Sequence, residues 1–285
     1  MTRSEITPRR ILIVGANSYI GKSLEKYLSQ WPDNYDVHSI SVRGKNLTAH
    51  MFTGYDVVFH AVGIAHIRET KQSRNLYYEI NRDLAISTAK AAKAGGVRQF
   101  IVLSSMSVYG LTTGQIRKDT APRPANAYGD SKLQADESIE AISDQSFRFA
   151  CLRPPMVYGK DCKGNYQLLR RFALSAPLFP DIDNRRSMVY IDNLCEFIKR
   201  VIDSEAAGVF FPQNAEYMNT TQMVKLIAEA NGKRIRTTRI FNPAIRALRM
   251  NLVNKVFGDL TYEPVDTVEM RGIRESIFLT EDRNS

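Results

Sequence analysis

A short apolar segment that runs straight into a glycine turn is the feature that most restricts how this chain of 285 residues can fold. Residues 10–14 (RILIV) form a continuous run rich in β-branched side chains, which is typical of a strand buried on both faces of a parallel sheet. The turn over residues 15–21 follows, and then a helical stretch over residues 22–30. A helix that begins directly after such a turn offers free N–H groups and a positive dipole end to a pyrophosphate. This order predicts the first strand, turn and helix of a dinucleotide-binding sheet.

The residues of this turn have separate expected roles. Gly15 permits the tight turn, and Gly21 permits close packing of the helix on the strand. Ser18 stands where the related Gly-x-x-Gly-x-x-Gly pattern has its middle glycine, so its side chain crowds a phosphate slightly while its hydroxyl can donate a hydrogen bond. The cofactor contacts predicted in this turn are Gly15, Asn17, Ser18, Tyr19, Ile20 and Gly21.

Strand-like and helix-like segments alternate from residue 11 to residue 152. This alternation predicts an α/β fold, a doubly wound parallel sheet of the Rossmann type. We expect residues 1–160 to form the dinucleotide-binding domain, completed by parts of 187–212, and residues 161–285 to form a smaller, interleaved α/β substrate-binding region. The later expected strands are 36–42, 55–63, 99–103, 147–152 and 208–211; the expected helices include 76–94, 166–173, 191–203, 219–230 and one from Asn242–Pro243 with Ile245, Leu248, Leu252, Val253 and Val256 on one face.

The tip of the second expected strand, residues 41–43, carries no acidic residue. An acid there would accept hydrogen bonds from a ribose 2′-hydroxyl and favour NAD(H). Ser41 removes that charge, and Arg43 can pair with a 2′-phosphate. The tip therefore favours NADP(H) as the cofactor, and NAD(H) remains the alternative cofactor. The alternative interpretation of Arg43 is a solvated loop side chain.

The third expected strand ends in Ala61, Val62 and Gly63, where small side chains let a cofactor lie across the strand ends. His60 precedes them and is expected to be a packed strand-end side chain rather than a catalytic group.

A Tyr-x-x-x-Lys pattern, Tyr128 to Lys132, stands at the start of a predicted helix after a proline-containing loop. Positions i and i+4 share one face of a helix. The ammonium would favour the phenolate, so Tyr128 could exchange a proton near neutral pH. A solvated helix pair is the alternative for an isolated pattern of this kind.

Composition excludes several classes of protein. Apolar residues make up 44% and charged residues 24% of the chain, which is ordinary for a globular protein. No apolar run of transmembrane length and no signal-peptide core is found. The three cysteines form no metal or redox pattern, so we expect reduced thiols, a cytoplasmic location and no metal site. The net charge of +9 can attract an anionic ligand such as a nucleotide, but no nucleic-acid-binding motif accompanies it, so a nucleic-acid partner and a membrane span are not expected.

Five segments in this order over residues 11–200 resemble the extended short-chain dehydrogenase/reductase family, in its branch of sugar-nucleotide epimerases, dehydratases and reductases. They are residues 15–21 (GANSYIG), 104–110 (SSMSVYG), 128–132 (YGDSK), 152–159 (LRPPMVYG) and 186–192 (RSMVYID).

The resemblance implies roles for individual residues. It implies that Ser105 orients the substrate oxygen, with Ser107 as the alternative, and that Tyr128 is the acid/base. It implies that Lys132 binds the nicotinamide ribose and lowers the tyrosine pKa. Further implied contacts are Asn81 and Pro155 at the cofactor and Ser107, Asn165 and Arg186 at the nucleotide sugar. A helix cap for Asn165 and a surface charge for Arg186 are the alternatives.

The activity implied by the resemblance is hydride transfer at C4 of a nucleoside-diphosphate sugar, with a UDP-sugar expected. Two activities fit this chemistry, that of a 4-keto reductase and that of a 4-epimerase. The resemblance also implies a role in polysaccharide biosynthesis and is compatible with a homodimer. Met106 and Ser107 replace the Asp-Glu pair of the 4,6-dehydratases, which speaks against water elimination. The rival is a non-catalytic, redox-sensing regulator with the same fold; it would be marked by loss of the Ser-Tyr-Lys set, and all three members are present.

Overall fold

The computed structural model describes residues 7–42, 44–65, 69–240, 242–243, 254, 256–268 and 270–282. The chain divides into two compact units. The first unit comprises residues 1–108, 122–153 and 195–210, and the second comprises residues 109–121, 154–194 and 211–285.

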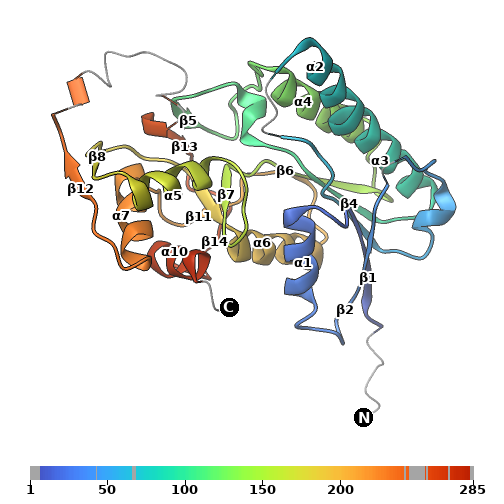
Figure 1. The fold of residues 1–285 in the computed structure, drawn as a ribbon. Coiled ribbons are helices and arrows are strands. Elements are labelled where there is room, and N and C mark those ends of the chain that lie inside the picture. Colours follow the sequence, from blue (N-terminus) through green and yellow to red (C-terminus); the bar gives the residue numbers. More distant parts are fainter. Residues whose placement is uncertain are drawn as a thin grey trace. The chain divides into compact units, whose positions relative to one another are not determined.

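The first unit is built on a six-stranded sheet in the order β2-β1-β3-β4-β6-β10 (Figure 1). Every neighbouring pair in this sheet is parallel. The expected doubly wound parallel sheet is therefore confirmed. The strands are β1 (Arg9–Val14), β2 (Tyr35–Ile40), β3 (Val57–His60), β4 (Gln99–Leu103), β6 (Arg148–Leu152) and β10 (Gly208–Phe210).

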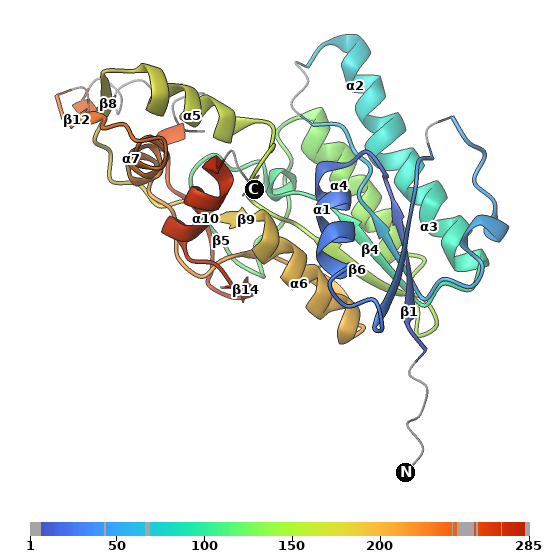
Figure 2. The same ribbon diagram turned by 60° about the horizontal axis from the view of Figure 1, so that its bottom comes forward.

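Helices cover both faces of this sheet (Figure 2). Helices α2 (Lys71–Tyr77), α3 (Leu84–Ala94) and α4 (Ala127–Glu140) lie on one face. On the other face lie α1 (Tyr19–Leu28) and the C-terminal part of α6 (Ile191–Asp203), which are joined by a hydrogen bond from Tyr27 Oη to Glu196.

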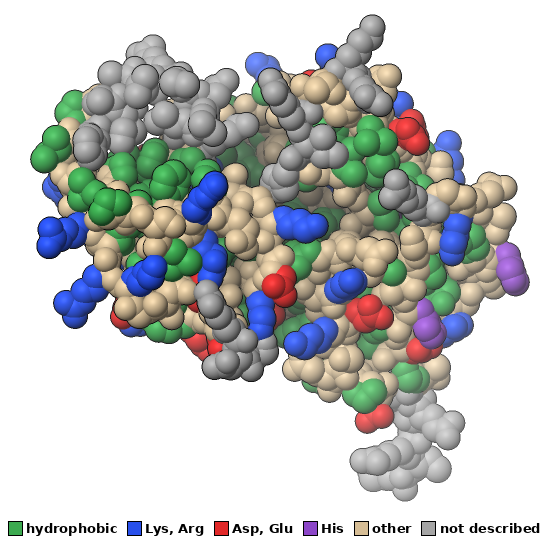
Figure 3. Space-filling view, viewed as in Figure 1, with side chains coloured by type: hydrophobic (Ala, Val, Ile, Leu, Met, Phe, Trp, Pro, Cys, Tyr) green, Lys and Arg blue, Asp and Glu red, His purple; other side chains and the backbone are tan. Residues whose placement is uncertain are grey.

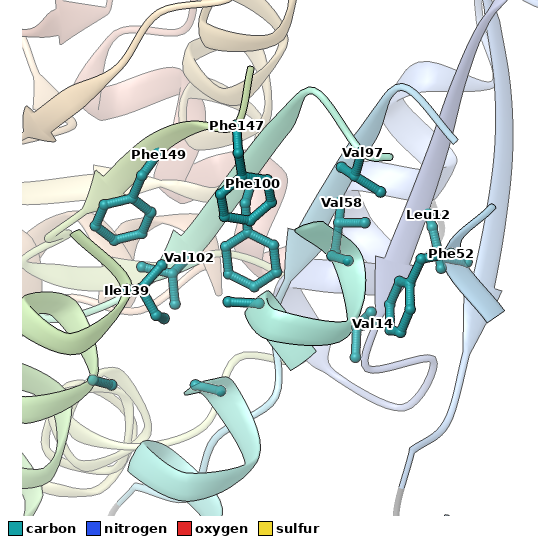
Figure 4. Packing of buried hydrophobic residues seen from close by; sticks show 14 of the residues in the cluster. Leu12, Val14, Phe52, Val58, Val97, Phe100, Val102, Ile139, Phe147 and Phe149 are labelled. Atoms are coloured by element: carbon teal, nitrogen blue, oxygen red, sulfur yellow. The ribbon is translucent and has the colours of Figure 1, made fainter. Parts of the chain in front are cut away.

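The core between the sheet and α3 and α4 is aromatic at its centre (Figure 4). Phe100 of β4 lies beside Phe147, with ring centroids 5.8 Å apart. Helix α3 presents the small side chains of Ala85, Ala89 and Ala92 to this core. Their spacing of about one helical turn places them on the face of α3 that packs on the sheet.

The helix expected at residues 76–94 begins earlier and is not uniform. It starts at Lys71, because Thr70 and Ser73 form a capping box. A π-helical segment, Tyr78–Asp83, then separates α2 from α3. The first helix also begins earlier than expected, at Tyr19, because Ser18 is its N-cap and accepts a hydrogen bond from the Gly21 amide.

Among the described residues of the second unit, paired short strands accompany the helices α5 (Asn165–Ser175), α7 (Thr220–Ala230) and α10 (Ile273–Glu281), and α7 packs against both α5 and α10. The buried carboxylate of Glu281 accepts hydrogen bonds from Tyr166, Arg170 and Asn231, and so ties the three helices to one another. The parallel strand pairs are β7 (Met156–Tyr158) with β9 (Met188–Tyr190), β8 (Leu178–Pro180) with β12 (Arg236–Thr238), β5 (Gly114–Ile116) with β13 (Leu260–Tyr262), and β11 (Gln213–Asn214) with β14 (Thr267–Val268).

Most of the helix expected from Asn242–Pro243, including Ile245, Leu248, Leu252 and Val253, lies outside the described residues. Within the described ranges, no helix is long and apolar enough to cross a membrane, and no cluster of His, Cys, Asp and Glu is suited to a metal ion. The basic excess is spread over the face shown in Figure 3, with acidic side chains among the Lys and Arg residues.

Candidate active site

The glycine turn lies where β1, β2 and β3 end. Gly15 adopts a φ of +123°, in the region that favours glycine. A Cβ on Gly15 would stand 3.2 Å from the carbonyl carbon of Ala61 and 3.3 Å from the Val62 amide nitrogen. The amides of Gly15 and Ala16 both donate to the Ile40 carbonyl, at 2.8 and 3.1 Å. The turn is therefore held close to the two neighbouring strands.

The remaining turn residues shape the start of α1. Ser18 Oγ accepts from the Gly21 amide at 3.3 Å, so its hydroxyl already has a structural partner. A Cβ on Gly21 would stand 3.0 Å from the Gly15 carbonyl oxygen, which explains why a glycine fits there. Tyr19 and Ile20 form the first turn of α1, and Asn17 is exposed in front of it.

The tip of β2 carries the exposed Ser41 directly after Ile40. Arg43 lies outside the described residues, so the structure does not place the side chain expected to meet a 2′-phosphate. Close to this tip, Glu25 of α1 accepts a hydrogen bond from Ser39 Oγ of β2 at 2.9 Å.

The π-helical segment places Asn81 at the exit of β3. Asn81 is fully buried. Its Oδ1 accepts from the Ile64 amide at 2.8 Å, and its Nδ2 donates to the Ile64 carbonyl at 3.1 Å and to Ser131 Oγ at 3.3 Å. One side chain thus joins the loop after β3 to α4. Such π-helical turns are rare and frequently occur at functional sites.

Helix α4 starts against the loop that follows β4. Asn126 caps the helix by accepting from the Gly129 amide at 2.9 Å. A Cβ on Gly129 would overlap the carbonyl oxygen of Ser107, so only glycine allows the first turn of α4 to touch this loop. This approach brings Tyr128 close to Ser105, whose side chain acts to lower the pKa of the phenol. Ser105 Oγ also accepts from the Ser107 amide at 3.1 Å.

Lys132 lies one turn further along α4 and is 5% exposed. Its Nζ donates to the Leu103 carbonyl at 2.8 Å. A Cβ on Gly63 would stand 2.9 Å from this Nζ and 3.2 Å from Asn81 Oδ1. The structure therefore gathers Ser105, Tyr128, Lys132, Asn81 and Gly63 at the carboxyl ends of β3 and β4, which is where parallel sheets of this kind bind ligands.

The other predicted site residues belong to the second unit. Asn165 is the first residue of α5, whose N-cap is Gly164, so the cap alternative for Asn165 is wrong. Arg186 is not a free surface charge either, because its Nη1 donates to the Gly258 carbonyl at 2.6 Å and to the Asn254 carbonyl at 3.3 Å. Burial lowers the pKa of Arg186, and Asp259 opposes this effect. Pro155 is buried in the short segment before β7.

Residues 11–210 match the NAD dependent epimerase/dehydratase family. The chain belongs to this family. The resemblance to extended short-chain dehydrogenases/reductases is thereby confirmed. A curated relative, the UDP-glucose 4-epimerase of Vibrio cholerae, is 29% identical over 253 residues, which are 79% of this chain and 77% of the relative.

Two solved structures show the family fold. A UDP-glucuronic acid 4-epimerase from Bacillus cereus in complex with NAD is 16% identical, with a TM-score of 0.75 over 95% of this chain and 97% of that chain. A dTDP-4-dehydrorhamnose reductase from Bacillus anthracis in complex with NADP is 20% identical, with a TM-score of 0.67 over 81% of this chain and 83% of that chain. Similarity at these identities shows the fold alone, and the two complexes contain different dinucleotides.

In this family member, burial governs the acid–base properties of the Tyr-x-x-x-Lys pair. Packing around the partly exposed phenol raises the pKa of Tyr128 above its ordinary 10.0, and the hydrogen bond with Ser105 opposes that rise. The Lys132 ammonium donates to the Leu103 carbonyl, and its expected lowering of the Tyr128 pKa stays a prediction. Burial lowers the pKa of Lys132 to about 8, with an opposing contribution from Asp136. Near neutral pH, the site therefore holds a protonated phenol beside an ammonium.

One further group was missed by sequence reasoning. Asp136 lies on α4 one turn after Lys132, is 3% exposed, and binds Ser104 and Arg153. The available signal was its i+4 spacing from Lys132 within a helix that packs on the sheet. Its partners come from strands that are distant in sequence, so spacing alone did not connect them.

His60 behaves as expected of a packed strand-end side chain. Its ring is fully buried and stacks on Phe100, with centroids 6.1 Å apart. Burial, together with the charge of Lys132, lowers the pKa of His60 to about 3. The ring is therefore neutral near neutral pH.

Proposed function

We propose that this protein is a 4-keto reductase or a 4-epimerase that catalyses hydride transfer at C4 of a nucleoside-diphosphate sugar. A UDP-sugar is the favoured substrate. Tyr128 exchanges the proton of the sugar oxygen, Ser105 orients that oxygen, and Lys132 holds ribose hydroxyls. The observation that carries the proposal is the approach of the first turn of α4, with Tyr128 beside Ser105, to the end of β4, where the Lys132 ammonium is buried and donates to the Leu103 carbonyl.

The residues at the strand ends fit a nicotinamide dinucleotide. Gly15, Gly21 and Gly63 let the turn and the end of β3 pack closely on their neighbours without a side chain, and α1 begins directly after the turn with its N-terminus facing the strand ends. A bound dinucleotide would supply or accept the hydride. The residues proposed to hold it are Gly15, Asn17, Ser18, Tyr19, Ile20, Gly21, Ser41, Arg43, Ala61, Val62, Gly63, Asn81, Tyr128, Lys132 and Pro155.

The protonation states of the site suit the reduction of a carbonyl. As negative charge develops on the carbonyl oxygen, the protonated Tyr128 can donate its proton to it. Ser105 can hydrogen-bond the same oxygen and stabilise that charge. The Lys132 ammonium adds a fixed positive charge at the end of β4. In the reverse direction, Tyr128 would first have to lose its own proton, and its phenolate would then accept the hydroxyl proton, so the same residues can serve both outcomes.

The nucleotide sugar is proposed to contact Ser107, Asn165 and Arg186. The names of the two 4-epimerases described above, which act on UDP-glucose and UDP-glucuronic acid, favour a UDP-sugar. We keep as part of this proposal the division into a dinucleotide-binding region, residues 1–160 with parts of 187–212, and a substrate-binding region, residues 161–285.

A screen of UDP- and dTDP-sugars with and without NADPH, followed by product analysis, tests the function. A changed C4 configuration without net NADPH loss identifies an epimerase, and stoichiometric NADPH oxidation identifies a reductase. Binding of the dinucleotide with no turnover of any sugar would favour the non-catalytic regulator. We expect no 4,6-dehydratase product, because Met106 and Ser107, the residues after Ser105, carry no carboxylate.

The cofactor preference follows from the tip of β2. Ser41 presents no carboxylate to a 2′-phosphate, and Arg43 and Lys45 add positive charge to the same loop. Charge-assisted hydrogen bonds contribute ~1.5–3 kcal/mol, so NADPH should bind about tenfold to a hundredfold more tightly than NADH. Dissociation constants for both, in wild type and Arg43→Ala, check this. Equal constants in wild type contradict the preference, and a preference that survives Arg43→Ala assigns it to another residue.

A further inference from the structure

Helix α4 buries an acid one turn after Lys132. Asp136 is 3% exposed and Lys132 is 5% exposed, and the i, i+4 spacing puts them on one face of the helix. Transferring a carboxylate out of water is costly unless charges and hydrogen bonds compensate for the lost hydration. The partners of Asp136 therefore show what the acid does in this fold.

Those partners stand at the ends of two adjacent strands. Asp136 Oδ2 accepts from Ser104 Oγ at 2.8 Å, and from Arg153 at 3.2 Å (Nε) and 3.1 Å (Nη2). Ser104 follows β4 directly and precedes Ser105, and Arg153 follows β6 directly. The Ser104 amide also donates to the Leu152 carbonyl at 2.7 Å. One carboxylate oxygen thus fixes the exits of β4 and β6 against α4.

The other titratable groups around Lys132 carry no compensating charge near neutral pH. His60 of β3 is neutral, because burial and the Lys132 charge lower its pKa to about 3. Burial raises the pKa of the Cys151 thiol of β6 well above its ordinary value, so this thiol is also neutral. Tyr128, whose ring lies 5.8 Å from that of Tyr77, is a neutral phenol, because burial raises its pKa. Arg153 lies at the carboxylate of Asp136 and is itself positive.

We propose that Asp136 is a positioning residue of this site: its carboxylate keeps Lys132 in the ammonium form and holds Ser104, and hence Ser105, in place at the end of β4. The statement about the charge of Lys132 does not depend on the proposed function. The statement about Ser105 rests on the proposed function. Burial raises the pKa of Asp136, while Arg153, Ser104 and Lys132 lower it. The guanidinium of Arg153, which stays protonated in proteins, favours the ionised acid.

The sign of the expected effect follows from this arrangement. Asp136 raises the pKa of Lys132 against the lowering caused by burial. Removing the carboxylate must therefore lower that pKa further, so the ammonium is lost at a lower pH. An opposite charge at short range shifts a pKa by at least about one unit. We expect a shift of this size, which corresponds to roughly tenfold less ammonium form at any pH above the transition.

The test uses Asp136→Asn, which keeps the shape of the side chain and removes its charge. Lysine labelled with ¹³C at Cε is titrated by NMR, and the Lys132 signal is assigned by its absence from Lys132→Arg. We expect Lys132 to titrate about one pH unit lower in Asp136→Asn. The alkaline limb of kcat/KM for the sugar nucleotide should move to lower pH by the same amount. An unchanged Lys132 titration in the folded variant would overturn the inference.

Two further variants separate positioning from folding. Glu281→Gln in the second unit removes another buried carboxylate, which pairs with Arg170 at 2.8 Å; it should lower stability without moving the Lys132 titration. If Asp136→Asn fails to fold because Arg153 loses its buried ion pair, Asp136→Asn/Arg153→Met removes both charges and should still lower the pKa of Lys132. The two proposals can fail separately. If the wild-type protein turns over no sugar but Lys132 still titrates lower in Asp136→Asn, the link between Asp136 and Lys132 stands and the proposed function alone is refuted.

Discussion

Tyr128 carries most of the proposed chemistry, because its phenol is protonated near neutral pH and lies beside Ser105 at the end of β4. Tyr128→Phe should leave dinucleotide affinity nearly unchanged and reduce turnover by ~10²- to 10⁴-fold, the usual contribution of a general acid. Tyr78→Phe is the matched control, since Tyr78 Oη donates to Asp130 at 2.6 Å rather than to a site residue. Turnover of Tyr128→Phe at the wild-type rate would show that another group transfers the proton.

Gly63 controls where the Lys132 ammonium rests. An added Cβ would stand 2.9 Å from Lys132 Nζ, and the flexible lysine can move away with little loss of stability. Gly63→Ala should therefore lower turnover at least about tenfold while the midpoint of urea unfolding changes little, since an overpacked flexible contact relaxes more easily than a backbone contact. A large loss of stability with unchanged activity of the folded fraction would contradict this role.

Helix α4 depends on a glycine for its contact with the loop after β4. A glycine-to-alanine change inside a helix ordinarily stabilises it by ~0.5–1 kcal/mol. At Gly129 the sign should reverse, because the new Cβ would overlap the Ser107 carbonyl, which is backbone and cannot move aside. Gly129→Ala should lower the free energy of unfolding by ~1–3 kcal/mol, as measured by urea denaturation. Unchanged or increased stability would show that α4 can shift away from the loop.

Strands and helices are predicted best from the sequence when the signal for them lies within their own residues. The strand at residues 10–14 and the parallel sheet were predictable because continuous β-branched runs and glycine turns are local signals. The π-helical segment Tyr78–Asp83 was not, because a helix that changes its hydrogen-bond pattern keeps an ordinary helical composition. Asp136 was missed for a related reason: its partners, Ser104 and Arg153, lie 32 and 17 residues away along the chain.

At the scale of the whole molecule, the candidate residues are divided between two units. The first unit holds Ser105, Tyr128 and Lys132, and the second holds Asn165 and Arg186. The motif segments that carry the family resemblance named these residues, and their roles, like the expected substrate-binding region at residues 161–285, stay predictions. What it could not predict is how Arg186 is held, since its partners Asn254 and Gly258 come from the C-terminal region.

This division predicts separable binding defects. Arg186→Ala should weaken UDP binding by about tenfold or more, because a charge-assisted contact with a diphosphate contributes ~1.5–3 kcal/mol. NADPH affinity, which we assign to residues of the first unit, should stay within about twofold of wild type, a difference below ~0.5 kcal/mol. Isothermal titration calorimetry with UDP and with NADPH measures both affinities in the same variant.

The carbonyl contacts of Arg186 require a control for folding. The Nη1 group donates to the Gly258 carbonyl at 2.6 Å, so Arg186→Ala also leaves a carbonyl without that partner and should cost ~1–3 kcal/mol of stability. Asn184→Ala is a matched perturbation, since Asn184 Nδ2 donates to Thr220 at 3.0 Å in the same unit and is not a predicted sugar contact. If both variants lose stability but only Arg186→Ala loses UDP affinity, the guanidinium binds the diphosphate. Equal loss of UDP affinity in the two variants would assign Arg186 a structural role and remove it from the site.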